Sequence, residues 1–360
     1  MIKDFLANER RKINTELVKF FKRKEREESS ELFADFIRKF REFVLPDNGK
    51  PKRIHPILLI AAYQGIINPM YLEDYISDIR NVAICVELLH NSHLVHDDLI
   101  DQDEKRRGEP TFHVSLRQEI TDLYKNSSHV DLEKISNLYG RNVSILGATL
   151  GYFFGIDIIK ESQFPENLKL LALNEYSEAI DYVIKGEIIE EYLDFHNITM
   201  SLEQYLNIAE MMRARVFEKS TKIGAILAKG NIHYQIKPLS EAMLRIGQAY
   251  AIRDDILDME EDIKSQKKKI LYILAIQNTD EKQSKILNDI FNKKEKISAE
   301  DLRTVKDIFG ETNATVVAEH FSKNLVSQAK NYLNDIYPDL NKEQKNFFNE
   351  FADYIYLREM

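Results

Sequence analysis

The sequence predicts an all-α protein in a single domain that covers residues 1–360. Its apolar residues mostly recur at the spacing of amphipathic helices, and it contains only 12 glycines and 8 prolines, so that few tight turns or strand breaks are available. No segment is long or biased enough in composition to act as an interdomain linker. A chain of 360 residues is within the range of one large helical domain with a substantial core.

The first third of the chain is predicted to contain several helices. They cover residues 1–45 (as one or two amphipathic helices), Pro56–Gln64 and Ile79–Leu99. The charge run Lys22–Glu28 is expected to face solvent, and Pro46-Asp47-Asn48-Gly49 is a strong turn signal. By composition, Lys105–Pro110 is predicted to be a loop.

The remainder of the chain is also predicted to be helical. The predicted helices cover residues 133–160, 166–195, 201–229, 238–263, 267–278, 300–335 and Lys342–Arg358. At Lys229-Gly230-Asn231, a cation in the last turn and a glycine just beyond it indicate a helix end. The lysines of Lys264–Lys269, apart from Lys267, and those of Lys293–Lys296 are interpreted as solvated faces, since acidic residues lie beside them.

Composition also limits partners and location. The net charge of -9 argues against a nucleic-acid partner. The single cysteine, Cys85, cannot form an internal disulfide, which fits a reducing compartment. The longest run without Asp, Glu, Lys or Arg, Ile54–Leu72, is interrupted by Pro56 and Pro69 and is interpreted as core helix and turn. With no membrane span and no signal peptide expected, the predicted location is the cytoplasm.

The first cluster of chemical interest is Asp97, Asp98 and Asp101, at the end of a largely apolar helix. On a helix, Asp97 and Asp101 lie on one face, with Asp98 beside them. Like charges at this spacing repel, so the set is tolerated only on a solvated face or around a cation. Carboxylates that share a site with substrate phosphates are the usual arrangement for Mg²⁺.

A second cluster repeats the pattern with Asp254, Asp255 and Asp258, again after a mostly uncharged helical run. One such cluster alone is more often a solvated helix face than a site. Two clusters at the ends of apolar helices favour metal binding, because a merely solvated face would continue as polar residues.

Basic residues accompany both clusters. Arg106 and Arg107 follow the first cluster, Lys52 and Arg53 precede it, and Lys267 follows the second. Arginine and lysine are the usual donors to the diphosphate charge that Mg²⁺ leaves unneutralised. Each of these cations taken singly is more often a plain surface residue.

These motifs resemble those of the trans-type polyprenyl diphosphate synthases, the family of farnesyl and geranylgeranyl diphosphate synthases. The resemblance is carried by both aspartate clusters, by Arg106-Arg107-Gly108 and by the helix Glu87–His96, and it runs from about Lys50 to Ala275. It implies a large helical bundle of the isoprenoid synthase type with a central substrate cavity, and a homodimer. The implied reaction is the Mg²⁺-dependent head-to-tail condensation of isopentenyl diphosphate with an allylic diphosphate.

The resemblance also implies roles for individual residues. Asp97, Asp101 and Asp254 would be Mg²⁺ ligands, with Asp98, Asp255 and Asp258 as direct or water-mediated helpers. Arg106 would hold the allylic diphosphate. Lys52, His90 and Arg107 match the residues that hold isopentenyl diphosphate, and Lys267 matches a lysine that follows the second motif.

The chain departs from the family pattern at several positions. His55 stands where an arginine is usual, and its charge is expected to depend on pH near neutrality. A Lys-Thr pair falls on Met212-Arg213, so that Arg213 or Arg215 is expected to replace the missing cation. The remaining departures are Ala148 for an aspartate, Ala251 for a glutamine, Glu187 and Glu190 in a Gly-Gln-x-x-Asp motif, and a shortened loop after the second cluster.

Product length is predicted from the residues before the first cluster. In the family, the positions occupied here by Ser92 and His93 help to set it. The small Ser92 suggests growth beyond farnesyl, to a geranylgeranyl-sized or longer product, with Tyr152, Phe153 and Phe154 as a floor further along the tunnel. Apolar residues of the same helix are expected to line that tunnel, because a hydrocarbon gains roughly 0.8 kcal/mol per buried methylene.

Three alternatives remain open at this stage. His90, His93 and His96, followed by Asp97, fit an HD-type metal phosphohydrolase, which would leave the second cluster unexplained. A terpene cyclase shares the first motif but usually carries a different second metal motif. The departures also allow a non-catalytic regulatory subunit, although all six aspartates are present.

Overall fold

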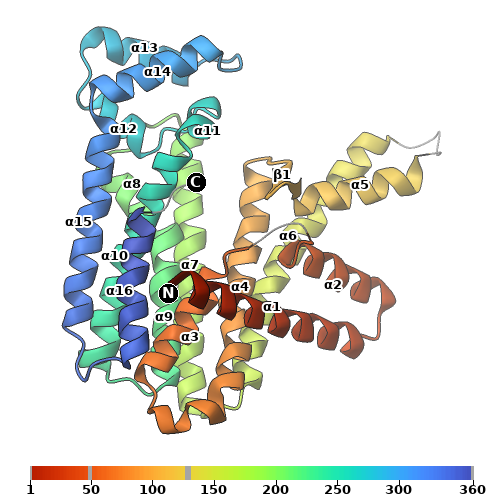
Figure 1. Ribbon diagram of the computed structural model, residues 1–360. Helices are drawn as coiled ribbons and strands as arrows, with labels where there is room; N and C mark the ends of the chain where they lie inside the picture. The colour runs from red at the N-terminus through yellow and green to blue at the C-terminus, as the bar shows by residue number, and fades with distance from the viewer. Residues whose placement is uncertain (1, 48–50, 126–130, 358–360) are drawn as a thin grey trace. The chain divides into compact units, whose positions relative to one another are not determined.

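The structure, a computed structural model, describes residues 2–47, 51–125 and 131–357. The predicted all-α fold is confirmed: helices account for nearly all regular structure in these residues, and the strands among them are the two-residue β1 (Lys105–Arg106) and β2 (Glu109–Pro110) (Figure 1). Part of the predicted turn Pro46–Gly49 and the predicted helix end at Arg358 lie outside the described residues.

The chain divides into two compact units. The first contains Met1–Tyr176 and Ile223–Lys229, and the second contains Ser177–Lys222 and Gly230–Met360. The chain passes between the units inside two helices. These are α7 (Glu166–Phe195) and α9 (Arg215–Leu227), which each contribute residues to both units. The single-domain organisation of the whole chain stays a prediction.

The first unit is built on a fully buried central helix. Its complete helices are α1 (Ile2–Glu27), α2 (Glu31–Val44), α3 (Ile54–Ile66), the 3₁₀ turn η1 (Pro69–Tyr71), α4 (Leu72–Ile100), α5 (Phe112–Tyr124) and α6 (Leu132–Glu161). Nearly every residue of α3 is buried, which explains why it is apolar on all sides. Helices α4 and α1 pack against it, and α2 packs on α1, with Leu17 and Phe40 fully buried.

Helix α6 packs closely on α4 and α5 through small residues. A Cβ added at Gly151 would lie 2.1 Å from Ser92 Oγ and 2.9 Å from Phe40 Cζ, so that only glycine fits there without rearrangement. Ser92 is fully buried, and its Oγ has no hydrogen-bond partner. Its side chain therefore packs into the contact between α4 and α6 instead of facing open space.

The second unit is a bundle in which α10 packs against α15 and α16 (Figure 1). Its elements are α8 (Leu202–Ala209), the π-helical turn η2 (Glu210–Ala214), part of α9, the π-helical turn η3 (Ile232–Ile236), α10 (Lys237–Leu257), α11 (Met259–Lys264), α12 (Ile270–Ile276), α13 (Glu281–Phe291), α14 (Ala299–Glu311), α15 (Ala314–Asn334) and α16 (Lys342–Leu357). Capping boxes at Ser201, Asp280 and Ser298 begin three of these helices.

Several element predictions are wrong in detail. The helix predicted at 300–335 is two helices, separated at Asn313, whose φ of 56° is left-handed and interrupts the helical hydrogen bonds. Helices α5 and α13 were not predicted. The helix end predicted at Lys229-Gly230-Asn231 is confirmed: α9 ends at Leu227, and Lys229 has a left-handed φ of 59°. Lys105–Pro110, predicted to be a loop, is a short antiparallel hairpin.

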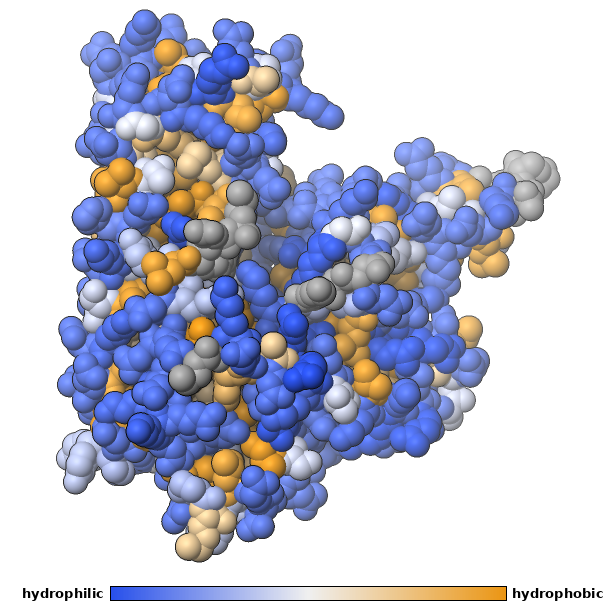
Figure 2. All heavy atoms as spheres, viewed as in Figure 1, coloured by the Kyte–Doolittle hydropathy of each residue, from blue (hydrophilic) through white to orange (hydrophobic). Residues whose placement is uncertain are grey.

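Helix α6 exposes several large apolar side chains, namely Ile135, Leu138, Ile145, Leu146 and Phe153. Among the described residues, it is the helix long and apolar enough to cross a membrane, although half of its apolar window is buried within the protein, and core helices of soluble proteins pass the same test. The predicted span-like run Ile54–Leu72 is α3 and η1, and α3 is core as predicted. In the view of Figure 2, hydrophilic side chains cover most of the surface, with apolar side chains in separate patches.

Candidate active site

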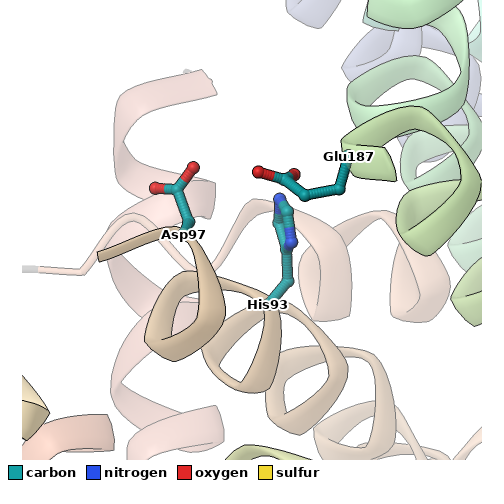
Figure 3. A group of neighbouring side chains, drawn as sticks. All are labelled: His93, Asp97 and Glu187. Atoms are coloured by element: carbon teal, nitrogen blue, oxygen red, sulfur yellow. The ribbon is translucent and has the colours of Figure 1, made fainter. Parts of the chain in front are cut away.

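The first aspartate cluster lies at the C-terminal end of α4. The helix ends at Ile100, where the N–H of Asp101 still donates to the carbonyl of Asp97 at 2.8 Å. Figure 3 shows His93 and Asp97 projecting from the same side of α4, one turn apart, and one potential ligand atom of each lies within 4.8 Å of the other. The spacing predicted for a shared helix face is therefore present.

The hairpin that follows α4 carries the two arginines back to the cluster. Its two-residue turn is Arg107-Gly108, with φ of 55° and 85°. Two consecutive positive φ values are typical of the tight turns that join antiparallel strands. In the strand before the turn, Arg106 donates from Nε to Asp98 Oδ1 at 2.5 Å and from Nη2 to Asp97 Oδ2 at 2.7 Å. One guanidinium thus joins two neighbouring aspartates.

Asp98 differs from its neighbours because it is buried. Burial raises its pKa to about 7, and Arg106 opposes that rise. Its Oδ1 accepts from Arg106, whereas its buried Oδ2 has no hydrogen-bond partner. A buried carboxylate oxygen without a partner is costly, so this atom is suited to accept a bond from a ligand or from water on a bound ion.

Both arginines also line a cavity of about 370 Å³ between α2, the hairpin and α5. Its lining includes the apolar residues Phe43, Phe112 and Leu116 and acidic residues such as Glu42 and Glu119. The predicted substrate residues Lys52, His55 and His90 do not line this cavity. The hairpin therefore has aspartates on one side of Arg106 and an open cavity beside it.

Arg53 was grouped with the diphosphate-binding cations, and this interpretation is wrong. The residue is only 2 % exposed, with a left-handed φ of 56°, and its guanidinium is bonded to other groups of the protein. It forms a buried ion pair with Glu87, donates from Nε to Asn14 at 2.9 Å, and donates from Nη2 to the Val44 carbonyl at 2.7 Å. Arg53 thus links α1, α2 and α4 through its side chain, next to Lys52 in the sequence.

The histidines of the predicted isopentenyl diphosphate site lie together. The His55 and His90 rings are 4.7 Å apart between centroids and inclined at 55°. His55 is 8 % exposed, and burial lowers its pKa to about 4. The expectation that its charge changes near neutral pH is therefore wrong for the free protein, because a buried imidazole favours the neutral form. Lys52, in contrast, is exposed.

The second aspartate cluster ends α10 in the second unit. Asp255 is buried and accepts a hydrogen bond of 2.6 Å from the Tyr205 hydroxyl at Oδ2. Asp254 is paired with Arg213, whose Nη1 lies 3.3 Å from Asp254 Oδ2. The Asp258 N–H donates to the Asp254 carbonyl at 2.8 Å, where the helix ends. Asp254 and Asp255 thus each have a specific side-chain partner in the free protein.

Of the two arginines expected to replace the missing lysine, Arg213 is the one paired with the second aspartate cluster. It lies in the π-helical turn η2, and π turns often occur at functional sites. Arg215 is instead held by Glu210 at 2.6 Å and Glu218 at 3.4 Å, with its guanidinium 4.8 Å from the centre of the Tyr182 ring. Arg215 is therefore held by acidic and aromatic residues outside the second cluster.

A lysine of the second unit was wrongly interpreted as solvated. Lys269 is largely buried and forms an ion pair with Glu190. Burial would lower the pKa of Lys269, but Glu190 and Asp255 raise it above its usual value. With Asp255 and Arg213, the pair lines a cavity of about 20 Å³, which is large enough for one water molecule. The uninterrupted apolar run that follows Lys269 was the signal that its side chain begins a buried helix.

The other predicted residues fall into simpler environments. Lys267 lines a small cavity with Asp262, whose pKa is raised to about 7 by burial and by Asp255. Ala148 and Ala251 are buried in helix contacts, and Ala251 also lines the cavity beside Lys269. Glu187 lies on the part of α7 in the second unit. The structure therefore gathers the first cluster with Arg106, and the second with Arg213 and Lys269, each within its own unit.

Comparison with known families gives one clear result. The family model described as "Polyprenyl synthetase" matches residues 39–309, a region that contains both aspartate clusters. This region extends beyond Lys50–Ala275, where the resemblance was clearest from the motifs.

Individual relatives agree with that match. The chain is 31 % identical over 258 residues to a short chain isoprenyl diphosphate synthase of Methanocaldococcus jannaschii, covering 68 % of each protein. It is 27 % identical to a geranylgeranyl diphosphate synthase of Saccharolobus solfataricus, covering 71 % of this chain and 72 % of that protein. A solved structure of a Corynebacterium glutamicum geranylgeranyl pyrophosphate synthase, complexed with isoprenyl diphosphate and magnesium, has the same fold, with a TM-score of 0.85, 22 % identity, and coverage of 98 % and 99 %.

Proposed function

Since this chain belongs to the polyprenyl synthetase family, we propose that it condenses isopentenyl diphosphate with an allylic diphosphate to give an all-trans product of geranylgeranyl size or longer. The chain is a prenyltransferase, and elongation of a prenyl chain is its activity. The observation that supports the substrate assignment best is the pair of aspartate clusters, each paired with an arginine. Arg106 Nη2 lies 2.7 Å from Asp97 Oδ2, and Arg213 Nη1 lies 3.3 Å from Asp254 Oδ2.

The donor atoms of the clusters fit Mg²⁺. They are carboxylate oxygens at the ends of two helices, and Asp98 Oδ2 is buried without a partner. Hard cations such as Mg²⁺ prefer oxygen ligands and are usually bound by a few carboxylates together with substrate phosphates. We assign Asp97, Asp101 and Asp254 as ligands, with Asp98, Asp255 and Asp258 in support. When bound, Mg²⁺ would neutralise part of the diphosphate charge.

The side chains of the protein would then hold the two substrates and the leaving group. Arg106 would donate to the allylic diphosphate, with Arg213 and Lys267 as further cations, and Lys52, His90 and Arg107 would hold isopentenyl diphosphate. Donors fixed around the departing diphosphate stabilise the charge that develops on it. The allylic carbon–oxygen bond breaks, the double bond of isopentenyl diphosphate forms the new carbon–carbon bond, and a proton leaves to the released diphosphate.

Product length is proposed to depend on the wall formed by α4 and α6. Ser92 is small but packs against Gly151, so that a bulky Ser92 variant would disturb the helix contact as well as the tunnel. His93, on the same face as Asp97 and only partly buried, is the better position to probe. A His93→Phe variant is expected to give a shorter product under the same conditions.

We further propose that the protein is a cytoplasmic homodimer. The outer face of α6 exposes Leu138, Ile145, Leu146 and Phe153, of which Leu146 is 70 % exposed. These positions recur at spacings of seven and eight, so they form one stripe along the helix. An exposed apolar stripe of this kind marks an interaction surface, and a second copy of the same stripe would cover it in a two-fold dimer.

The decisive test is an elongation assay. Purified protein is incubated with isopentenyl diphosphate and, separately, dimethylallyl, geranyl or farnesyl diphosphate, with and without Mg²⁺, and the chain length of the products is measured. A Mg²⁺-dependent series that stops at twenty or more carbons is the expected result. Asp97→Asn should abolish product, whereas Glu281→Gln, on the exposed start of α13, should not.

Absence of product from every starter, with folded protein, would contradict the proposal. The comparisons do not favour the regulatory-subunit or HD-phosphohydrolase alternatives, since the relatives are synthases.

A further inference from the structure

We propose that His55 and His90 form a paired-imidazole site that is neutral in the free protein and takes up a proton when the diphosphate of the homoallylic substrate binds beside it. This inference rests on the proposed function and adds to it a regulation by proton concentration. A permanently charged side chain in place of His55, such as arginine, would bind the same diphosphate without exchanging a proton.

The two rings come from different elements and meet in a charged environment. His55 lies in the first turn of α3 and His90 lies on α4, with ring centroids 4.7 Å apart. Glu87 and His93 from α4 and Arg106 and Arg107 from the hairpin act on the two rings, and Arg53, in the segment before α3, is paired with Glu87. Most of these groups are cationic or neutral.

This surrounding favours the neutral form of both imidazoles before a ligand binds. Burial lowers the pKa of His55 to about 4, with His93 adding to the effect. Burial also lowers the pKa of His90 well below its usual value, followed by the effects of His55 and Arg107. Two adjacent imidazoles disfavour each other's protonation. At neutral pH, the fixed cations of this site are therefore lysine and arginine.

An acceptor for a charged imidazole is already in place on the protein side. Glu87 is 1 % exposed, and its Oε1 is bonded by Arg53 and Asn91. Its Oε2 is buried without a hydrogen-bond partner, as is Asn91 Oδ1. Glu87 also raises the pKa of His55, opposing burial. The buried carboxylate therefore has one oxygen that the ion pair with Arg53 does not use.

Binding of a diphosphate shifts the protonation equilibrium of the imidazoles toward the charged form. The ligand brings at least two negative charges, and an opposite charge within about 4–6 Å favours the charged form of a titratable group. An imidazolium could then lie between Glu87 on one side and the diphosphate on the other. The proton comes from solvent, and it returns when the diphosphate leaves.

The test is calorimetric titration of the full-length protein with isopentenyl diphosphate in buffers of different ionisation enthalpy. The pH range is 7 to 8.5, above the last ionisation of a phosphate near pH 6. We expect uptake of between about half and one proton per bound molecule, and a Kd that rises roughly three- to tenfold per pH unit, since proton uptake and pH dependence of affinity are linked.

Three variants test whether the proton is taken up at His55. His55→Arg should bind without proton uptake and with a nearly constant Kd, because arginine is always charged. His55→Gln should bind more weakly and lose most of the uptake. His320→Gln, at an exposed position on α15, is the matched control and should behave as the wild type. Circular dichroism establishes that each variant is folded.

Binding of isopentenyl diphosphate with no proton exchange, or full exchange in His55→Gln, would overturn this inference and leave the proposed function intact. Failure of the folded wild-type protein to bind isopentenyl diphosphate and to form product would instead overturn the proposed function, and the inference with it. The wild-type measurement decides the question even where a variant does not fold.

Discussion

At the scale of single residues, the ion pair between Lys269 and Glu190 is the clearest case of a side chain whose role depends on a distant partner. The two residues are 79 positions apart in the sequence, and their side chains are only 19 % and 14 % exposed. Burial would raise the pKa of Glu190, but Lys269 lowers it below its usual value. Each charge is therefore stabilised in this place chiefly by the other.

We predict that Lys269→Met destabilises the protein by about 3 kcal/mol, because it leaves Glu190 charged and poorly solvated. The double variant Lys269→Met/Glu190→Leu should recover most of that loss. Lys264→Met is the control, since Lys264 is 56 % exposed, and it should change stability by less than about 0.5 kcal/mol. Urea unfolding measures all three, and equal stabilities of the single and double variants would contradict the prediction.

The site residues that could be predicted share one property, which is that their signal is local. The two aspartate clusters stand out because three carboxylates follow an apolar run within five residues. Arg53 and Lys269 were interpreted wrongly because their partners, Glu87 and Glu190, are 34 and 79 residues away. No local pattern distinguishes a lysine that faces solvent from one that a remote carboxylate holds in the core.

At the scale of elements, the contact between α4 and α6 shows how small residues set a helix separation. Gly151 has no room for a side chain, because Ser92 and Phe40 lie directly opposite. Overpacking of a well-packed contact typically costs 1–3 kcal/mol. This contact also positions the part of α4 that leads to Asp97.

We predict that Gly151→Ala destabilises the protein by about 2 kcal/mol and that adding Ser92→Gly restores part of the loss. Gly310→Ala is the matched control, because a Cβ at Gly310 in α14 meets nothing within 4 Å. It should stabilise the protein by about 0.5–1 kcal/mol, since glycine disfavours helix. A Gly151→Ala protein as stable as Gly310→Ala would refute this account of the contact.

The elements themselves could be predicted where periodicity was long, as in α4, α6 and α10. Boundaries failed where a single residue leaves helical geometry, as Asn313 does with its positive φ. Helix α5 was missed because it follows a turn-rich segment, and the sequence gives no long apolar face there: only Phe112, Val114 and Leu116 are buried.

At the scale of the whole molecule, the apolar stripe of α6, formed by Leu138, Ile145, Leu146 and Phe153, stays exposed in the single chain. We predict that Leu146→Glu converts the proposed homodimer to monomers at micromolar concentration, because a charge would be buried at the centre of the interface. Leu32→Glu, which changes an 87 % exposed leucine on α2, should leave the dimer intact. Analytical ultracentrifugation distinguishes the two.

A wild-type protein that sediments as a monomer would contradict the dimer directly. Elongation activity should be measured in parallel, since it tests whether assembly and catalysis are separable. If Leu146→Glu is monomeric and inactive while it remains folded, the dimer is required for catalysis as well as for covering α6.

The π-helical turn at Glu210–Ala214 indicates how the sequences of relatives should align with this one. A turn of this kind holds more residues than the α-helical turn it replaces, so it can be regarded as a single-residue insertion between α8 and α9. Deleting one residue there would rotate α8 relative to α9 by about 100°. Tyr205 would then turn away from Asp255, which it now reaches at 2.6 Å. A relative without this turn should therefore align with a one-residue gap between Ile208 and Ala214, and should have lost either the tyrosine or its aspartate partner.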